Sequence, residues 1–586
     1  MNAFAGYISL SSQAVLEQKI HYMAENLVRY QPDEQHFFGD HRARFVQLVR
    51  YNTPESKNHK PHAGYLHDIR LDGEFEGSDA DFALNTFKKH GVEGFKNLRG
   101  DFALALWDNA SGELTCLRDA VGQRLLYYTY RPGKFLAFAT TIRALTSLPE
   151  IRQRANQDKA SEFLMLMSSA PEQTFYQDIH RLAPGHSLHL TRGQLTTKKF
   201  SHWPIIKPIH FAKPQDYEEA FLELFASAIK SRSRSLYPIG AHLSGGLDSS
   251  SVAALAAQMG QTIHTYSAFP PIGFTGQQKP GWNLDDTHHV LSLTRKNPNL
   301  KPTILRSENK NLFSNLNDSY PYLDGPPLNP WNRVWTDEIF EAAAKNNVRT
   351  LLSGAMGNAT ISWHGHTVKQ QLGRLARQST NWLGRPWAEA LKQCAISEKA
   401  ASAKKEIFHR HHWRLQNPRM AMVSGGLVQE ALAFFSAERA IWGIEVRDPT
   451  HDQALVEFCL GLPNNQFVSK GMNRSLIRRS MKGFLSEEIR LRVDKGDQLS
   501  HWPIKIDETY HQMKEEWAQL AVCPTVSPLV DAARLSGMIE TWPKLEVGLR
   551  ETKGEYRTVW LRAFFLARYV SWIEHGGRRK EGLGSP

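Results

Sequence analysis

The seven residues Ser-Gly-Gly-Leu-Asp-Ser-Ser at 244–250 constrain this chain more than any other stretch. They follow an apolar run at 239–243 and precede an alanine-rich run at 251–257, an order that predicts a strand, a turn and a helix. The glycines allow φ > 0 and a close approach of backbone N–H groups to a ligand, and a helix start favours a polyphosphate. Asp248 is suited to hold a divalent cation against the phosphates. A serine-rich capped loop without a ligand is the alternative.

No lysine follows the glycines, so this is not the Gly-x-x-x-x-Gly-Lys-Ser/Thr phosphate loop. The stretch resembles instead the pyrophosphate loop of ATP pyrophosphatases, which cleave ATP between its α- and β-phosphates and adenylate a substrate. The resemblance implies ATP and Mg²⁺ as cofactors. It also implies that pyrophosphate and Mg²⁺ are bound by Ser244, Gly245, Gly246, Asp248, Ser249 and Ser250.

The composition is that of a globular protein with several domains. The 586 residues are 41% hydrophobic and 10% aromatic, which suffices for two to four cores. We expect no signal peptide and no membrane span, and four scattered cysteines favour a reducing, cytoplasmic compartment. The net charge of +12 is spread along the chain, so we interpret it as solvated surface and expect no nucleic-acid partner.

The pattern changes once along the chain. Residues 1–205 hold short alternating apolar runs separated by turns, which predicts a strand-rich domain. A proline-bearing linker follows, and residues 215–586 alternate helix with strand before becoming mostly helical beyond about 375. This alternation predicts a parallel sheet that binds ligands at the carboxyl ends of its strands. The predicted elements are helices near 218–230, 287–294 and 336–346 and strands at 239–243, 262–267 and 350–352.

Together the two halves resemble the glutamine-dependent asparagine synthetase family. The likeness is carried by Ser-Asp-Ala-Asp at 78–81, Leu-Arg-Gly-Asp-Phe-Ala at 98–103, the 244–250 loop, and Glu-Val-Arg-Asp-Pro at 445–449. It implies an α/β fold: an N-terminal Ntn-hydrolase-like αββα sandwich and a C-terminal parallel-sheet ATP pyrophosphatase domain with a helical end.

Two departures from the family pattern change the expected reaction. The family's glutaminase nucleophile is a cysteine that follows Met1, and here that position is Asn2. An amide cannot replace a thiolate, so the first half is expected to be a degenerate glutaminase, with Asp79 only capping a helix. The second departure is at 353–359, where the family's acids become Ala355, Asn358 and Ala359. Asn358 still offers a carbonyl oxygen to a cation, though more weakly than a carboxylate does.

The altered loop resembles that of lasso peptide cyclases, a branch of the family with an inactive amidotransferase half. Residues 324–332, 442–450 and 495–498 match the same branch. The resemblance implies that an Asp or Glu side chain of a ribosomal precursor peptide is adenylated. The peptide's own N-terminal amine then closes a macrolactam. It further implies a leader-binding or leader peptidase protein as partner.

The resemblance also assigns roles to single residues. Leu243 and Ala268 are expected to read adenine through their backbone, Ser353 and Gly354 to contact ATP, and Lys495 to neutralise the leaving pyrophosphate. Asp248 and Asn358 are the expected metal ligands, and these two with Lys495 form the catalytic set.

Other polar residues receive structural interpretations. Asp285 and Asp286 either cap a helix, which is the more frequent outcome, or act near the nucleotide, and Asp324 is either a second acid near the nucleotide or a turn residue. The adjacent His288 and His289 do not share a helix face, so zinc ligation is not expected.

Three other functions stay open on the sequence. They are asparagine synthesis, a β-lactam synthetase-like ligase with an internal amine, and a non-catalytic scaffold that binds peptide or nucleotide.

Overall fold

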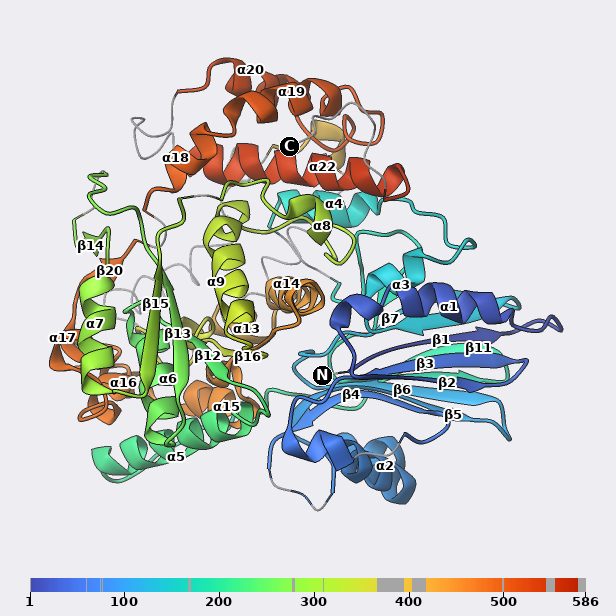
Figure 1. Cartoon of the computed structure of the whole chain (residues 1–586), viewed down its shortest axis with the longest axis horizontal. Coiled ribbons are helices and arrows are strands. Elements are labelled where there is room, and N and C mark those ends of the chain that lie inside the picture. Colours follow the sequence, from blue (N-terminus) through green and yellow to red (C-terminus); the bar gives the residue numbers. More distant parts are fainter. Residues whose placement is uncertain are drawn as a thin grey trace, which may run out of the picture.

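The structure is a computed structural model of the chain (Figure 1). It describes residues 2–58, 61–73, 75, 77–166, 170–276, 280–308, 310–365, 395–402, 418–497, 500–543 and 554–577.

The first half contains two antiparallel sheets. One has the strand order β2-β3-β1-β8-β7-β9 and the other β11-β10-β6-β5-β4. The strands are β1 (Ala3–Ser9), β2 (Glu34–Gly39), β3 (Ala43–Val49), β4 (Tyr65–Leu71), β5 (Gly100–Asp108), β6 (Glu113–Arg118), β7 (Tyr127–Arg131), β8 (Phe135–Ala139), β9 (His180–Arg181), β10 (His186–Thr191) and β11 (Gln194–Lys199). The helices are α1 (Glu17–Glu25), α2 (Asp79–His90), α3 (Ile142–Thr146) and α4 (Gln157–Leu164).

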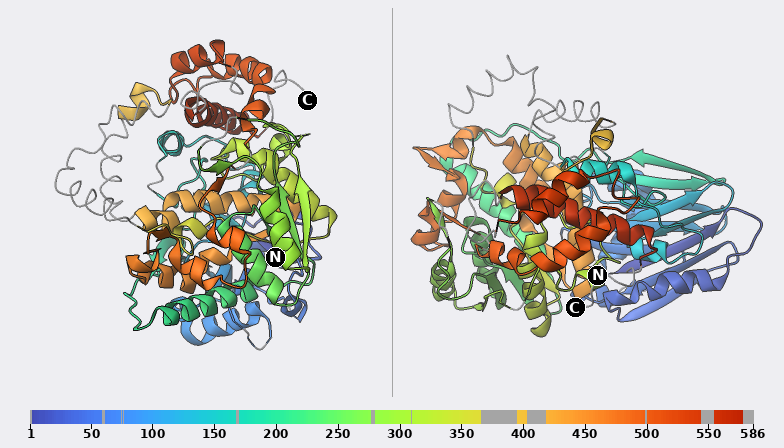
Figure 2. Two further views of the ribbon diagram at one scale, coloured as in Figure 1. Left: turned by 90° about the vertical axis from the view of Figure 1, so that its left-hand side faces the viewer. Right: turned by 90° about the horizontal axis from the view of Figure 1, so that it is seen from above.

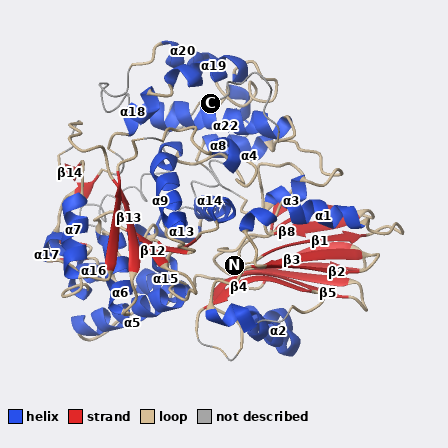
Figure 3. Cartoon of the chain, in the orientation of Figure 1, coloured by secondary structure: helices blue, strands red, loops and turns tan. Residues whose placement is uncertain are grey.

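Successive side chains of the strands point to opposite faces of each sheet. The two sheets therefore pack against each other and each is covered by helices on its outer face, which gives four layers. In β1, Phe4 and Ile8 enter the core between the two sheets, while Ala3, Ala5 and Tyr7 face the cluster that contains α1 and α3. This is the period of two expected of strands buried on both faces. Helix α2 packs on the outer face of the second sheet through a separate cluster. The predicted αββα sandwich is confirmed, and Figure 3 shows its strands as one group.

The second half begins with helix α5 (Pro214–Arg232), after a stretch at 200–213 without helix or strand. Up to residue 352 its elements are β12 (Ile239–His242), α6 (Leu247–Gln258), β13 (Ile263–Ala268), β14 (Trp282–Asn283), α7 (Thr287–Lys296), β15 (Leu300–Leu305), α8 (Leu316–Ser319), α9 (Arg333–Lys345) and β16 (Thr350–Leu352). From residue 418 they are α13 (Pro418–Ser424), α14 (Gly426–Trp442), β17 (Glu445–Arg447), α15 (Gln453–Gly461), β18 (Val468–Ser469), β19 (Met472–Asn473), α16 (Ser475–Ser480), α17 (Glu487–Leu491), β20 (Lys495–Gly496), α18 (Trp502–Asp507), α19 (Tyr510–Leu520), α20 (Ala532–Glu540) and α22 (Leu561–Glu574).

A five-stranded parallel sheet lies at the centre of this half. Its order is β15-β13-β12-β16-β17, and all four pairings are parallel. The chain leaves β12 toward β13 and β15, and later returns to the other side of β12 with β16. The loops that follow β12 and β16 therefore diverge at a switch point, where open parallel sheets bind ligands. The predicted parallel sheet is confirmed.

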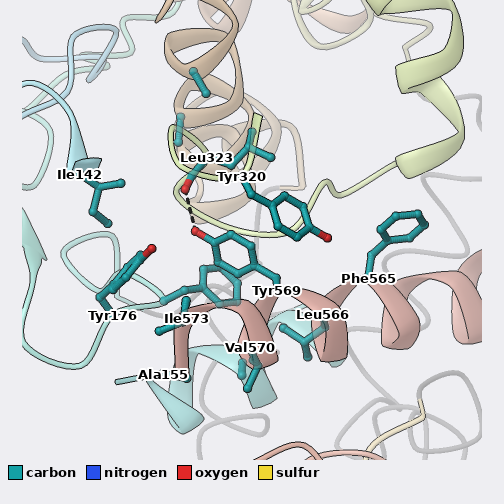
Figure 4. Packing of buried hydrophobic residues seen from close by; sticks show 14 of the residues in the cluster. Ile142, Ala155, Tyr176, Tyr320, Leu323, Phe565, Leu566, Tyr569, Val570 and Ile573 are labelled. Carbon is teal, nitrogen blue, oxygen red and sulfur yellow. Dashed lines mark hydrogen bonds between the residues drawn. The ribbon is translucent and has the colours of Figure 1, made fainter. Parts of the chain in front are cut away.

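The helical end of the chain closes over both halves. Helix α22 is buried along most of its length and shares one hydrophobic cluster with α1, α3 and α4. The Tyr569 hydroxyl donates to the Leu323 carbonyl at 2.6 Å, beside Tyr176 and Ile142 of the first half (Figure 4). Seen from above, the segment from α18 to α22 lies across the middle of the molecule (Figure 2). The two halves consequently share one of the molecule's hydrophobic clusters, while each half also has clusters of its own.

One helical stretch within the described ranges, Arg419–Trp442, is long and apolar enough to cross a membrane by length and composition alone. In this structure it is divided at Gly425 into α13 and α14. Core helices of soluble proteins pass the same test. The expectation that the chain has no membrane span stays a prediction.

Candidate functional site

The 244–250 loop connects the end of β12 to the start of α6, as the sequence predicts. Gly245 has φ of +76°, and a Cβ built there would lie 3.0 Å from His289 Cβ and 3.2 Å from Asp286 Cβ. A side chain at this position would therefore be strained and crowded. Gly246 caps α6 without a side-chain hydrogen bond, which leaves the first-turn amides of the helix available to an anion.

The serines of this loop divide into two kinds. The hydroxyls of Ser244 and Ser249 lie 2.9 Å apart on the exposed side of the loop, and the Ser244 amide donates to Ser249 Oγ at 3.1 Å. Ser250 is fully buried, and its hydroxyl has no hydrogen-bond partner among the described residues. Ser244 and Ser249 are thus placed to contact a phosphate. The Ser250 hydroxyl is on the buried side of the helix start, so its predicted phosphate contact would have to be made there.

Asp248 lies at the base of the loop. Its Oδ1 atom is buried and makes no hydrogen bond within the described part of the chain, and burial raises the pKa of the carboxyl. The Ser362 hydroxyl and the charge of Arg474 act in the opposite direction. The same Oδ1 atom lies against Gly357 of the loop after β16. Asp248 is in the first turn of α6, so its carboxylate is suited to hold a Mg²⁺ ion against a polyphosphate.

The loop after β16 packs directly on Asp248. A Cβ at Gly354 would lie 3.0 Å from the Asp248 carbonyl carbon, and one at Gly357 would lie 2.5 Å from Asp248 Cγ. The loop is held from behind by Asp448, whose carboxylate accepts from the Met356 amide at 2.9 Å. Burial raises the pKa of Asp448 to about 6. Ser353 and Gly354 are thus brought beside the 244–250 loop, although the sequence separates them by a hundred residues.

Asn358 is exposed at the end of this second loop, but its oxygen is already engaged. The side-chain Oδ1 accepts a hydrogen bond from Arg474 Nη2 at 2.9 Å. Arg474 has φ of +56° and precedes α16. The guanidinium of Arg474 therefore lies where a metal ion was expected. A metal ion at Asn358 would compete with Arg474 for the same side-chain oxygen. Arg474 is a residue that the sequence interpretation missed, because no motif marks it.

Lys495 approaches the site from the C-terminal region. It lies on β20, which pairs in parallel with β14, and its ammonium is 5.5 Å from the centre of the Trp282 ring. The neighbouring Gly496 lies directly against the Asp286 carboxylate. Lys495 is exposed, and it is Gly496 that brings this segment next to Asp286, which borders Gly245 of the loop.

Arg492 connects this segment to the loop itself. It donates to the Gly245 carbonyl at 3.0 Å and to Asp286 Oδ2 at 3.1 Å. Its side chain is almost fully buried, so this charge is a fixed part of the loop's support. The sequence interpretation did not single out Arg492, because its partners are about 200 residues away.

The two residues expected to read adenine end adjacent strands. The Leu243 amide donates to the Tyr266 carbonyl at 2.9 Å, and the Ser267 hydroxyl donates to the Leu243 carbonyl. Ala268 is the last residue of β13. The backbone of Leu243 is therefore already hydrogen-bonded within the sheet, and a nucleotide contact there would use the second lone pair of its carbonyl.

The roles expected for three sets of aspartates differ in part from those in the structure. Asp324 lies in a bend, as one of its two expected roles requires, and its carboxylate serves the first half: it is buried, accepts from the Tyr127 hydroxyl at 3.0 Å and pairs with Arg181 at 3.1 Å. Asp79 does not cap α2, because Ser78 does so.

Asp79 instead pairs with Arg234 of the second half at 2.9 Å. Of the two aspartates before α7, Asp285 accepts from the Thr287 amide as a cap, while Asp286 pairs with Arg492.

Asn2 occupies the position of the family's glutaminase nucleophile, and its polar groups are hydrogen-bonded. Asn2 is 9% exposed, its Oδ1 accepts from the Arg50 amide at 3.0 Å, and its Nδ2 lies 3.2 Å from His67 Nδ1. Its backbone amide donates to Asp68 at 3.1 Å. Cys116 does not substitute, since it is buried between the sheets and burial raises the pKa of its thiol.

Buried ion pairs occupy the junction between the halves near Asn2. Asp68 pairs with Arg439 at 2.7 Å, and Glu445 lies between Arg124 and Arg447, the latter at 2.6 Å. All of these side chains are at most 7% exposed. Glu445 and Arg447 therefore have a structural role at this junction.

The comparisons with known proteins agree with this architecture. The glutamine amidotransferase domain matches residues 69–201, and the asparagine synthase family matches residues 220–570. The fold and the loop define an asparagine synthase-like ligase joined to an amidotransferase-type domain. The chain belongs to the asparagine synthase family.

The similar proteins include full-length and partial matches. The glutamine-hydrolysing asparagine synthetase 3 of Bacillus subtilis is 22% identical over 92% of this chain and 94% of its own length. A protein named putative asparagine synthetase 2 of Methanocaldococcus jannaschii is 27% identical over 48% of this chain and 53% of its own. Amidase chry2 of Gibberella zeae is 25% identical over 47% of this chain and 42% of its own length.

Proposed function

We propose that this protein is an ATP- and Mg²⁺-dependent ligase that closes a macrolactam in a ribosomal precursor peptide. An Asp or Glu side chain of the peptide attacks the α-phosphorus of ATP, and pyrophosphate leaves. The peptide's own N-terminal amine then attacks the acyl carbon, and AMP leaves with formation of the amide. A leader-binding or leader peptidase protein would deliver the precursor.

The observation that carries this proposal is the combination of Asn2 with the 244–250 loop. Asn2 is buried and hydrogen-bonded where a nucleophile would have to act, so glutamine is not a source of ammonia. The phosphate-binding elements are nevertheless in place, with the α6 start, Asp248 and Gly245 assembled at the sheet's switch point. A ligase with ATP chemistry but no ammonia supply needs an amine from its own substrate.

The chain's own residues divide the work at the phosphates. The α6 amides and the hydroxyls of Ser244 and Ser249 would hold the pyrophosphate group, and Asp248 would hold Mg²⁺, which shields the phosphate charge when bound. Arg474 and Lys495 would neutralise the charge that develops on the leaving pyrophosphate. Fixed cations of this kind stabilise a transition state without reorganisation.

Asparagine synthesis is the second candidate function, favoured by the names of the similar proteins. It would here require free ammonia, because no thiolate is available at position 2. A β-lactam synthetase-like ligase shares the internal amine, and the loop around Asn358 is the feature that argues against it. A non-catalytic scaffold is disfavoured by the intact 244–250 loop together with Lys495.

One assay separates these functions. The full chain is incubated with ATP, Mg²⁺ and the candidate precursor, and in parallel with aspartate plus either ammonium or glutamine. We expect AMP, pyrophosphate and a peptide lighter by one water only with the precursor. Asparagine formation with ammonium and no dehydrated peptide would refute the macrolactam proposal. No ATP turnover with any substrate would favour the scaffold.

A single variant tests the metal assignment. Asp248→Asn keeps the shape of the side chain but removes its charge, so ATP–pyrophosphate exchange should fall at least a hundredfold, on the order expected for loss of a metal ligand. Asp216→Asn in the first turn of α5 is the matched control and should leave exchange unchanged. Wild-type exchange in the Asp248 variant would overturn the assignment.

A further inference from the structure

Two histidines and a glutamate lie together behind the phosphate loop. His288 and His289 are in the first turn of α7, and Glu488 is on α17. Glu488 Oε1 lies 3.5 Å from His288 Nε2 and 3.2 Å from His289 Nδ1, and one ligand atom from each of the three residues lies within 4.8 Å of the others. The two imidazole centres are 3.9 Å apart. The cluster thus joins two elements separated by about 200 residues.

His289 has buried nitrogens that nothing in the described structure satisfies. Its side chain is 4% exposed, and neither ring nitrogen makes a hydrogen bond with any described residue. Glu488 lies close to Nδ1 but outside hydrogen-bonding geometry. Leaving such a group unpaired costs about 1–3 kcal/mol.

The two distances from Glu488 suit a small divalent ion, and the two imidazole ligand atoms lie within 4.8 Å of each other. Zinc binds imidazole nitrogen and carboxylate oxygen at about 2.0–2.2 Å, so tetrahedral ligands lie about 3.3–3.5 Å apart. Both distances from Glu488 are close to this value. We propose that His288, His289 and Glu488 bind one Zn²⁺ ion, with water in the fourth position. The adjacent histidines do not share a helix face, but Glu488 approaches from a second element and completes the set.

The positive charge of Arg492, close to the proposed ion, is balanced by neighbouring carboxylates. Arg492 is the cation that acts on His289, and it pairs with Asp286 at 3.1 Å and with Asp494 at 2.8 Å. Its charge is therefore balanced by two carboxylates, while Glu488 remains for the metal.

The ion would fasten the segment that carries Lys495 to the phosphate loop. His289 lies against Gly245, and α17 leads within a few residues to Arg492, which donates to the Gly245 carbonyl. A metal bridge between α7 and α17 would fix His289 and Arg492, the two residues that contact Gly245. Its role is to position the loop, and it is separate from the Mg²⁺ proposed at Asp248.

The test uses the full chain after treatment with EDTA and requires no peptide substrate. Zn²⁺ binding is measured by calorimetry, and Co²⁺ is added as a probe of tetrahedral ligation by visible absorption. We expect one equivalent to bind and to raise the melting temperature. His288→Ala, whose side chain is exposed, and Glu488→Gln should each weaken Zn²⁺ binding more than tenfold.

The control is His21→Ala, which removes a surface histidine 3.9 Å from Glu17 and should leave binding unchanged. Absence of saturable binding in the wild type would overturn the proposal. So would equal binding by the wild type, His288→Ala and Glu488→Gln. Because no ATP or peptide is present, neither result depends on the proposed ligase activity.

Discussion

Gly357 and Asp248 are in direct contact, so that a Cβ at Gly357 would lie 2.5 Å from Asp248 Cγ. The loop after β16 is thereby fixed against the carboxylate at the base of the phosphate loop. The absence of a side chain at 357 is what permits this contact.

Gly357→Ala should therefore displace one loop from the other. We expect ATP–pyrophosphate exchange to fall at least tenfold, with a loss of about 1–3 kcal/mol of stability from overpacking. Gly537→Ala in α20 is the control, since a Cβ there meets nothing within 4 Å. Unchanged exchange in the Gly357 variant would show that the contact is not needed for nucleotide chemistry.

Arg474 should act on the phosphates through its charge. Removing it as Arg474→Ala is expected to lower kcat about tenfold, an effect of roughly 1.4 kcal/mol on the barrier, because the charge it meets develops in the transition state. Arg474→Lys keeps the charge at the same φ of +56° and should recover part of the loss. Steady-state kinetics over a range of ATP concentrations measures both. Equal losses in the two variants would indicate that Arg474 only shapes the loop around Asn358.

The Asn2 side chain is predicted to be structural. Asn2→Ala leaves the Arg50 amide without its acceptor, so the free energy of unfolding should drop by about 1–3 kcal/mol. Chemical denaturation reports this change. ATP turnover with the precursor peptide should persist, and wild-type protein should release no glutamate from glutamine. Glutamate release by the wild type would contradict the assignment of a degenerate glutaminase.

Glu445 should be among the most sensitive residues at the junction. Glu445→Gln removes the charge shared by Arg124 and Arg447, which leaves buried Arg447 without a carboxylate among the described residues and Arg124 with only Asp68 at 3.7 Å. We expect a loss of about 3–5 kcal/mol in unfolding experiments. Glu341→Gln breaks the exposed pair with Lys345 and should change stability by less than about 1 kcal/mol. Comparable small effects at both sites would refute the role given to the buried cluster.

His451 should contribute to acid sensitivity. Burial lowers its pKa to about 4, while its Nε2 donates to the Val423 carbonyl at 2.8 Å. Between pH 6.5 and 4 the unfolded chain binds this proton more readily than the folded chain, so the contribution is present above pH 6.5 and is lost as pH falls toward 4. The total is about 3 kcal/mol.

Buried acids act in the opposite direction over part of this range, since the pKa values of Asp119 and Asp448 are raised to about 6. The test is therefore a difference between proteins. His451→Gln should flatten the pH dependence of unfolding free energy by one proton relative to the wild type. Parallel curves would show that His451 does not titrate as its burial implies.

Local pattern predicted most of the fold. The strand at 350–352 is found at Thr350–Leu352, and the strand expected at 239–243 ends one residue earlier. Helix α5 begins four residues before the predicted 218, because Pro214 starts it. These features depend on neighbouring residues, which a sequence displays directly.

Ion pairs and hydrogen bonds between residues far apart in the sequence could not be predicted from local pattern. Asp68 and Arg439 are 371 residues apart, and Asp324 meets Tyr127 across 197 residues. Asn358 was expected to face a metal, yet it meets Arg474, 116 residues later. Periodicity carries no information about which charges come together, so these contacts required the folded structure.

The shared core and the buried charges at the junction have a consequence for how such a chain can change over time. A gene fragment encoding only residues 215–586 would place Arg439, Glu445 and part of α22 in water without their companions. We therefore expect the second half to need the first half for its folding, whatever reaction the first half catalyses. Any attempt to graft the synthetase half onto another protein must carry its N-terminal companion with it.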